Sequence, residues 1–404
     1  MTIMVSGHGI AGLSAALAAA NAGHDVALCG AAPATAPPGG IQLAPNGWQA
    51  LDQLGLGDAA MQCATRLDHI IVRDLASGAT LTRLPLTYQY ASISRADMLR
   101  LLQDAVAARA SITLHARLIN QAVTQDDGVA LVCDDGRSMQ ATALIAADGM
   151  NGFGRRFVTG ATPGADYQSA RGDMRASMRA GMRGDMRAGM RGDMRVTMRA
   201  DIDADDLPAA FAQPASNLWL GQGAHLVHYP IAGGRRINFA VTLSARQAAG
   251  NWQARIFRAD PMLEQLASSQ FQWTKTSLPP AGSPVCWRRG RVALAGDAAH
   301  IMPPHLAQGA GQALQDAASL QYALCHSSDI DNALAIYARN RTMAVSAVVR
   351  KADISGKVMA FGGARGRLRN MLISVAGPAF LQSWLADVWA GDPHLARSSA
   401  KPAN

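Results

Sequence analysis

The sequence predicts a two-domain α/β fold: a Rossmann-like domain, a second domain with a mostly antiparallel β-sheet, and helices at the C-terminus. The chain has 404 residues, which is too many for one simple core. A glycine motif within the first twelve residues lies between two apolar segments. A later apolar segment ends in Gly296-Asp297 and leads through two prolines into a glycine-rich turn. Both patterns are typical of strand-to-helix turns that bind a nucleotide cofactor.

The first βαβ unit begins at the N-terminus. Thr2 to Val5 predicts a strand, Leu13 to Ala22 a helix that Gly23 ends, and His24 to Cys29 a second strand. Between strand and helix stands the GxGxxG motif. Its glycines permit a tight turn, close approach of a pyrophosphate, and packing of the helix on the sheet. We expect the motif and the first residues of the helix to bind the pyrophosphate: Gly7, Gly9, Ile10, Ala11 and Gly12.

One position departs from this motif. An acidic residue usually ends the second strand and binds the ribose hydroxyls. Here that position is Gly30, and no carboxylate follows before Asp52. The alternatives are a ribose held by water and backbone, a weakly bound cofactor, or a degenerate site.

Composition restricts the class of protein. Hydrophobic residues make up 49% of the chain and charged residues 16%, as in an ordinary soluble globule. Part of the net charge of +8 is local, because Arg171 to Asp203 holds eight arginines and five aspartates. No basic stripe interleaved with aromatic residues follows elsewhere, so we expect no nucleic-acid partner.

The five cysteines form no CxxC pair, which argues against a zinc site or a disulfide framework and favours the cytoplasm. We therefore predict no metal. The apolar N-terminus lacks the basic leading segment of a signal peptide. The longest apolar run, Met371 to Leu381, is too short for a bilayer and contains Pro378, so we predict no transmembrane segment.

Three further segments bear on the cofactor. Residues 39–46 form a glycine-proline loop before a predicted helix from Gly47 to Leu54. Arg95 lies at the start of another predicted helix. The strand Leu144 to Ala147 ends in Asp148-Gly149, with Arg155 after it.

Together with residues 291–317, these segments resemble the single-component FAD-dependent aromatic hydroxylases, which include salicylate, 3-hydroxybenzoate and 6-hydroxynicotinate monooxygenases. The resemblance covers most of the chain in the same order, including Leu218 to Phe239 and a helical end with Trp384 and Trp389. It implies a para-hydroxybenzoate hydroxylase-like FAD-binding domain and a β-sheet substrate domain.

The resemblance also implies roles around the flavin. Asp297 would bind the ribityl chain, and Pro304 with residues 306–311 would lie beside the isoalloxazine ring. Arg95 would contact the flavin or its phosphates, and Asp148 would lie near the cofactor and NAD(P)H. Gly152 replaces the serine that usually follows Asp148-Gly149. The alternatives are purely structural: Asp297 would cap a helix, and Arg95 would lie on the surface of its helix. Besides the first motif, the implied FAD-binding residues are Arg95, Asp148, Gly296, Asp297, Pro304, Ala307, Gln308, Gly309, Ala310 and Gly311.

The implied reaction uses NAD(P)H and O2 to hydroxylate a small aromatic substrate through a flavin hydroperoxide. A phenolic substrate needs a general base. The candidates are His225, Tyr229 and His305. His225 and Tyr229, four apart in a predicted strand, project to one face while His228 points away. The resemblance to 6-hydroxynicotinate enzymes at these residues favours a benzene or pyridine ring bearing hydroxyl and carboxylate groups.

A repeat interrupts the predicted substrate domain. From Met174 to Met198 methionine recurs every fourth residue, and an arginine follows each one. If the segment were a helix, this period would place the methionines in a stripe that drifts slowly around it. The glycines of the repeat, however, destabilise a helix. As a strand, it places methionine on one face. The functional alternatives are a basic lid, an anionic-surface contact or a partner helix, and we favour a tandem expansion tolerated at the surface.

We predict a discontinuous FAD-binding domain (1–66, 91–165 and 281–345), a substrate domain (67–90 and 166–280, with the repeat at 171–203) and a C-terminal helical region (346–404). Strands are expected at Leu67 to Leu75, Thr80 to Pro85 and within Trp219 to Val241, and helices from about Asp331. We expect a monomer or homodimer. Another FAD-dependent reaction, or a degenerate flavoprotein that acts as a binding module, remains the alternative.

Overall fold

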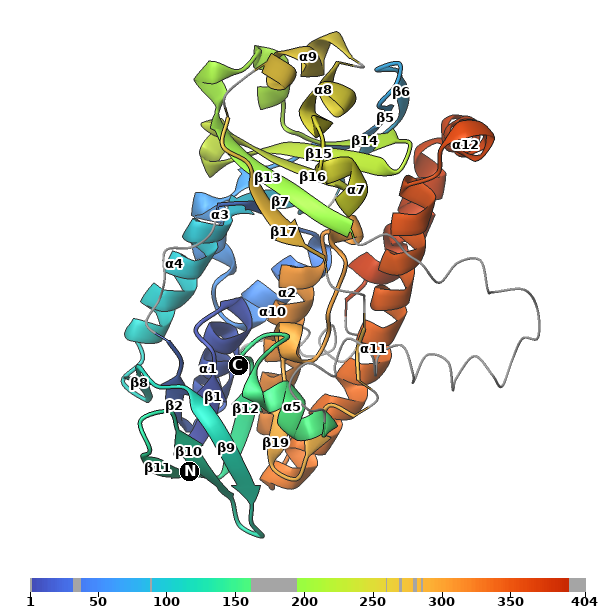
Figure 1. The fold of residues 1–404 in the computed structure, drawn as a ribbon. Helices are drawn as coiled ribbons and strands as arrows, with labels where there is room; N and C mark the ends of the chain where they lie inside the picture. Colours follow the sequence, from blue (N-terminus) through green and yellow to red (C-terminus); the bar gives the residue numbers. More distant parts are fainter. Residues whose placement is uncertain are drawn as a thin grey trace, which may run out of the picture.

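A computed structural model describes residues 2–31, 38–87, 89–160, 195–258, 260–268, 271–278, 282–284 and 286–391. Figure 1 shows a β-sheet domain stacked on a domain in which helices cover a second sheet, with two long helices along one side. Each domain has its own hydrophobic core. This two-part α/β architecture confirms the predicted fold class. The division at the predicted residue boundaries remains our proposal.

The lower domain is built on a six-stranded sheet in the order β18-β19-β12-β1-β2-β8. All its neighbouring strands pair in parallel except β18 and β19. The strands are β1 (Thr2–Ser6), β2 (Asp25–Cys29), β8 (Ile112–His115), β12 (Ala143–Ala146), β18 (Arg288–Arg289) and β19 (Val292–Leu294). Since parallel strands end at one edge, the turns after β1, β12 and β19 come together there.

Helices with small and apolar faces pack on this sheet. α1 (Ile10–Asn21) contacts α4 (Arg95–Ala107) and α10 (Gly309–Cys325), and α10 contacts α2 (Pro45–Gln53). α3 (Gly57–Cys63) and α5 (Phe153–Thr159) also belong to this domain, since α3 contacts α2 and α4 and α5 contacts β12 and β19. A three-stranded antiparallel sheet flanks the domain: β9 (Ile119–Thr124), β10 (Val129–Cys133) and β11 (Ser138–Ala141).

The upper domain is a seven-stranded sheet in the order β17-β13-β16-β15-β14-β5-β6, antiparallel except for the pair of β14 and β5. Its strands are β5 (His69–Asp74), β6 (Thr80–Pro85), β13 (Arg195–Asp203), β14 (Ala215–Gly221), β15 (Ala224–Ile231), β16 (Arg236–Ser244) and β17 (Thr274–Ser277). One face holds an apolar core with α8 (Trp252–Phe257) and α9 (Pro261–Ser268). A short helix, α7 (Ala245–Ala248), follows β16.

A small sheet joins the two domains. It has the order β3 (Gly40–Leu43), β7 (Ala91–Ser94) and β4 (Thr65–Arg66). The N–H of Gly39 donates to Asp201 Oδ2 at 2.7 Å, and the N–H of Gly40 donates to Asn238 Oδ1 at 2.7 Å. The glycine-proline loop is therefore fixed to the upper sheet by two polar side chains.

Two long helices close the chain. α11 (Ile330–Met359) confirms the expected helical end and crosses the proposed boundary at residue 345. α12 (Gly363–Trp389) is interrupted at Gly377, which has a φ of 63°, followed by Pro378. By length and composition, α12 is the one candidate membrane span among the described residues, and 6% of its apolar window is buried. The expected lack of a transmembrane segment stays a prediction.

The tail of the Met-Arg repeat forms a strand. Arg195 to Arg199 lie in β13, where Val196, Met198 and Ala200 enter the apolar core. Residues 161–194, which hold the rest of the repeat, lie outside the described part of the chain. The period of four is thus that of a strand where the structure describes it, and the arginines occupy the face opposite the core.

Candidate functional site

The N-terminal glycine motif forms a cradle after β1. A Cβ on Gly7 would lie 2.2 Å from the Ala147 carbonyl oxygen, and one on Gly12 would lie 1.8 Å from that of Gly7. Only glycine allows these contacts. A Cβ on Gly9 would instead meet open space. Within the described residues, the N–H groups of Ile10, Ala11 and Gly12 have no partner, so the positive end of α1 is free to bind a pyrophosphate.

At the end of β2, the side chain of His8 fills the space beside Gly30. A Cβ on Gly30 would lie 3.0 Å from the His8 ring. His8 Nδ1 lies 2.8 Å from the Ala31 carbonyl oxygen, and His8 Nε2 is buried with no partner in the described part of the chain. The missing carboxylate at Gly30 is evident from the sequence, but no sequence pattern indicated a role for His8.

Asp148 caps the helix that follows β12. Its Oδ2 accepts from the N–H of Gly154 at 3.0 Å, whereas Gly152, the N-cap residue of α5, supplies no side chain for the cap. A Cβ on Gly152 would lie 2.2 Å from the Asp148 carboxyl carbon. Thus the glycine at the usual serine position makes room for this arrangement. Burial raises the pKa of Asp148, and its Oδ1 is buried with no hydrogen-bond partner among the described residues.

The turn after β19 presents Asp297. This carboxylate is exposed and has no hydrogen bond among the described residues, although it immediately follows a fully buried strand. The preceding Gly296 is held rigidly: its N–H donates to Asp316 Oδ2 at 2.8 Å. A free carboxylate on a fixed turn suits a polyol chain such as the ribityl chain of FAD.

A buried ionic cluster supports this turn from below. Asp316 on α10 lies 2.7 Å from His300 Nε2 and 2.7 Å from Arg341 Nε of α11. Burial acts to raise the pKa of Asp316, but His300, Arg341 and the Gly296 N–H outweigh it, so the pKa lies below its ordinary value. These three side chains are completely buried and were not singled out from the sequence.

The glycine-rich turn reaches the start of α10, as predicted. The N–H groups of Gly309, Ala310 and Gly311 have no partner among the described residues. Gln308 is held by Asn46, whose Nδ2 donates to Gln308 Oε1 at 2.8 Å. Ala307 has a φ of 53°, a left-handed conformation that costs a non-glycine residue about 1 kcal/mol or more. This free helix end can stabilise negative charge on a reduced flavin.

The face of the upper sheet opposite its core is polar and is directed toward the lower domain. Register places the side chains in three rows across β13, β16 and β15. The rows are Asp201, Asn238 and Tyr229; Arg199, Ala240 and Val227; and Thr197, Thr242 and His225. Contacts of this face with Gly39, Gly40 and His305 show that it covers the segments that the sequence predicts to bind the flavin. We call these rows the polar face.

Two arginines come together at the polar face. Arg95 is largely buried, and burial followed by the nearby Arg199 charge lowers its pKa, against an opposing effect of Asp297. Neither guanidinium has an ion pair among the described residues. Arg199 belongs to the repeat, which the sequence analysis treated as a tolerated expansion, so this residue was missed. The pair offers positive charge to an anion.

His225 and His305 form the second polar group of the site. His305 Nδ1 lies 3.4 Å from His225 Nε2, although 80 residues separate them. Burial, then the neighbouring Arg195, lowers the pKa of His305 to about 4. Burial and His305 lower the pKa of His225 well below its ordinary range. Both rings are therefore neutral at pH 7 and can exchange protons with each other or with a bound ligand.

Tyr229 lies on the same face, two rows from His225, and His228 points into the core, where it accepts from Trp219 Nε1 at 3.2 Å. Tyr229 packs against Gly40, where a Cβ would lie 2.6 Å from the Tyr229 ring. Burial raises its pKa to about 12. The structure thus brings His225 to His305, while Tyr229 lies toward Arg95 and Arg199.

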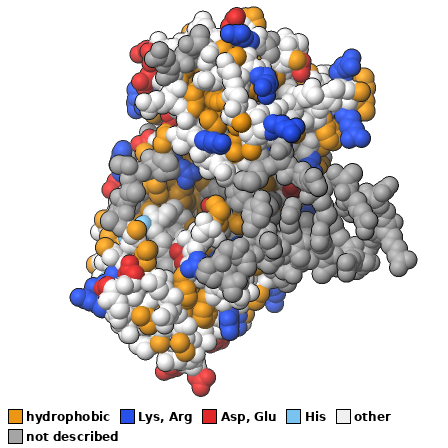
Figure 2. Space-filling view, viewed as in Figure 1, with side chains coloured by type: hydrophobic (Ala, Val, Ile, Leu, Met, Phe, Trp, Pro, Cys, Tyr) orange, Lys and Arg blue, Asp and Glu red, His pale blue; other side chains and the backbone are white. Residues whose placement is uncertain are grey.

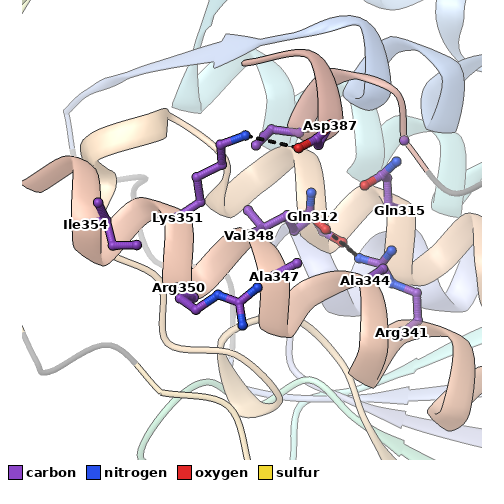
Figure 3. Close-up of a pocket in the computed structure, with 12 residues that line it drawn as sticks. Gln312, Gln315, Arg341, Ala344, Ala347, Val348, Arg350, Lys351, Ile354 and Asp387 are labelled. Carbon is purple, nitrogen blue, oxygen red and sulfur yellow. Dashed lines mark hydrogen bonds and ion pairs between the residues drawn. The ribbon is translucent and has the colours of Figure 1, made fainter. Parts of the chain in front are cut away.

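Two pockets border these elements. One of about 580 Å³ is lined by His305, Arg195, Gln247 and Lys357 among others, and so reaches the histidine pair from the side of α11. The other, of about 420 Å³, lies between α10, α11 and α12 (Figure 3) and is lined by Gln312, Gln315 and Arg341, near the Lys351–Asp387 ion pair. Figure 2 shows separate Lys and Arg side chains over the upper domain on the face in view. Within the described residues, no group of three metal-ligating side chains is present.

The fold and the site define a flavoprotein, and comparisons with known proteins agree. Residues 1–352 match the family described as FAD binding domain, so the chain belongs to that family. FAD is its cofactor, and the free helix ends, the cradle and the unpaired Asp297 fit that group. The chain is 30% identical over 407 residues to 3-hydroxybenzoate 6-hydroxylase 1 of Aquipseudomonas alcaligenes, covering 95% of this chain and 96% of that one.

A second relative is 6-hydroxynicotinate 3-monooxygenase of Bordetella bronchiseptica, 27% identical over 370 residues, with 86% of this chain and 89% of that one covered. Among solved structures, HpxO of Klebsiella pneumoniae, complexed with FAD and uric acid, has a TM-score of 0.80 at 24% identity, with 97% of each chain covered. These findings confirm the predicted class: the chain is an FAD-dependent monooxygenase related to aromatic hydroxylases.

Proposed function

We propose that this protein uses NAD(P)H and O2 to hydroxylate a small benzene or pyridine ring that carries a hydroxyl and a carboxylate group. The observation that carries the proposal is the polar face. There Arg199, which has no ion pair within the described residues, and the neutral pair of His225 and His305 cover the segments predicted to bind the flavin. A ring between them would meet a cation at one end and a proton acceptor at the other.

The cofactor supplies hydride acceptance from NAD(P)H and activation of O2 when it is bound. The cradle of Gly7, Gly9 and Gly12 would hold its pyrophosphate. Asp297 would bind the ribityl chain, and the free N–H groups at the start of α10 would lie at the flavin ring. Arg95 and Asp148 would border the same groove. These assignments, with Ile10, Ala11, Gly296, Pro304 and residues 307–311, are the ones the sequence predicted.

The substrate carboxylate would bind Arg199. Within the described part of the chain, the two guanidiniums have no ion pair, which leaves positive charge that an anionic ligand balances. A carboxylate binds an arginine in a bidentate manner. The row that contains Arg199 also contains Ala240 and Val227, whose small or apolar side chains leave a flat surface for an aromatic ring.

The substrate hydroxyl would face the histidine pair. A neutral imidazole accepts a proton, and the pair can pass it from His305 to His225 along their 3.4 Å contact. A phenolate so formed directs electrophilic attack on the ring. Its negative charge also favours protonated histidine, which offsets the low pKa of His305 in the protein without substrate. Tyr229 would orient the ring from the opposite end.

A matched panel of ligands tests this proposal by NAD(P)H oxidation and product analysis. We expect 3-hydroxybenzoate or 6-hydroxynicotinate to stimulate oxidation and to be converted to a dihydroxylated product. Benzoate, which lacks the hydroxyl, and 3-hydroxybenzyl alcohol, which lacks the carboxylate, should stimulate it at least tenfold less. Equal rates with all four ligands would contradict the proposal and favour another FAD-dependent reaction. A cytoplasmic location and a monomeric or homodimeric state stay predictions.

A further inference from the structure

At the end of β2, two neighbouring residues differ from the usual dinucleotide-binding motif. The acidic residue is missing at Gly30, and the residue between the first two glycines of the motif is His8. The two are in contact, because a Cβ on Gly30 would lie 3.0 Å from His8 Cγ and Cδ2 and 3.2 Å from the His8 backbone nitrogen. An acidic side chain at position 30 and the ring of His8 therefore compete for one space.

The hydrogen bond of His8 fixes which nitrogen carries the proton. His8 Nδ1 lies 2.8 Å from the carbonyl oxygen of Ala31, which can only accept. Nδ1 must therefore donate, and in the neutral ring Nε2 is then an acceptor. This Nε2 is buried and has no hydrogen-bond partner among the residues that the structure describes.

We propose that His8 replaces the missing carboxylate: its Nε2 accepts a hydrogen bond from a ribose hydroxyl of the adenosine half of FAD. The usual acidic residue at the end of β2 binds that ribose as an acceptor, and His8 Nε2 offers an acceptor at the same strand end. The proposal rests on FAD as the cofactor and concerns the adenosine end, remote from the hydroxylation chemistry. It also explains Gly30, because glycine is the residue that leaves room for the ring.

The test measures FAD affinity directly, by quenching of flavin fluorescence when FAD is added to the apoprotein. His8→Ala should raise the Kd for FAD about five- to tenfold, the loss of one neutral hydrogen bond. His326→Ala, which removes an exposed histidine on the surface of the chain, should leave the Kd unchanged. Thermal unfolding of each apoprotein checks that the variants are folded.

An analogue of FAD without the adenosine ribose hydroxyls identifies the contact. In the wild-type protein the 2′,3′-dideoxy analogue should bind about five- to tenfold more weakly than FAD, and in His8→Ala the two should bind equally. The exchange variant His8→Ala with Gly30→Glu should restore FAD affinity, because the carboxylate then has the space that the ring leaves. An unchanged Kd in His8→Ala, or equal losses with the analogue in both proteins, would overturn the assignment. The readout is the FAD affinity of the apoprotein, so failure of this assignment is distinct from failure of the proposed function, which the ligand panel tests in the wild-type protein.

Discussion

At the scale of single residues, the histidine pair depends on an unusual contact with α11. A Cβ on Gly356 would lie 2.2 Å from His305 Cδ2, so only glycine leaves room for the ring at this position. The pair is thus held by packing and by one 3.4 Å contact.

Replacing His305 tests its role as proton acceptor. His305→Ala should lower kcat for hydroxylation by about 100-fold, which is at the low end for loss of a general base, and should leave the Kd for FAD unchanged. Gly356→Ala should displace the ring and lower kcat in the same direction. In the His305→Ala background Gly356→Ala should have no further effect, because the clash is gone. Unchanged turnover in His305→Ala would remove this residue from the mechanism.

Arg199 should determine recognition of the carboxylate. Arg199→Gln should raise KM for the hydroxylated acid about 10- to 100-fold, the range for a charged hydrogen bond of 1.5 to 3 kcal/mol. Its effect on 3-hydroxybenzyl alcohol should be less than twofold. The control is Arg235→Gln, at an exposed position between β15 and β16. Equal losses for both ligands would assign Arg199 to the fold rather than to the substrate.

At the scale of elements, the turn after β19 depends on helices that are distant in the sequence. Asp316 on α10 accepts from the Gly296 N–H and is paired with Arg341 on α11. Replacement of Asp316 would leave the guanidinium of Arg341 buried without its counter-charge.

We expect Asp316→Asn to lower the free energy of unfolding by about 3 kcal/mol or more, as for removal of one partner of a buried ion pair. Urea unfolding of the apoprotein measures this loss. FAD affinity should fall as well, because the turn that carries Asp297 loses its support. The matched control is Asp104→Asn, on the outer face of α4, for which we expect less than 0.5 kcal/mol. A loss below 1 kcal/mol for Asp316→Asn would contradict the role of the cluster.

At the scale of the whole molecule, buried histidines should make stability sensitive to acid. Burial lowers the pKa of His228 to about 3 and that of His305 to about 4, and His225 shifts in the same direction. The unfolded chain binds protons on these groups near pH 6.5, whereas the folded chain does not. Stability should therefore fall as the pH decreases from about 6.5 toward 4, by at most about 1.4 kcal/mol per pH unit for each histidine.

Urea unfolding of the apoprotein at pH 7, 6 and 5 measures this dependence. His228→Asn keeps an acceptor for Trp219 Nε1 but does not titrate. It should therefore remove the contribution of one histidine from the slope of the unfolding free energy against pH. A slope identical to that of the wild-type protein would show that His228 contributes nothing to the acid sensitivity.

The sequence predicted those parts of the molecule that local patterns encode. The strand Thr80–Pro85, the start of α10 and the first βαβ unit lie where expected, because glycine spacing and apolar runs act over a few residues. The contact between His305 and His225 joins residues that are 80 positions apart in the sequence. The hydrogen bond from the Gly39 N–H to Asp201 joins residues that are 162 positions apart. Such contacts follow from tertiary packing, and no local pattern reports them.

The repeat shows the same limit in another way. Its composition indicated a surface expansion, yet its last units form β13, the second strand from one edge of the upper sheet, with Met198 in the core and Arg199 on the polar face. Strand alternation explains this outcome, but pairing with β16 and β17, which lie more than 30 residues away in the sequence, makes the segment a strand.

The most direct test of the account is the origin of oxygen in the product. The FAD-loaded protein would be supplied with NAD(P)H and 3-hydroxybenzoate under ¹⁸O2, and the product mass measured. We predict a dihydroxylated acid that carries one ¹⁸O atom, with no label when H2¹⁸O replaces ¹⁸O2. An oxidised product without ¹⁸O, or NAD(P)H oxidation that yields only hydrogen peroxide with every hydroxylated aromatic acid tried, would contradict the proposed monooxygenase reaction.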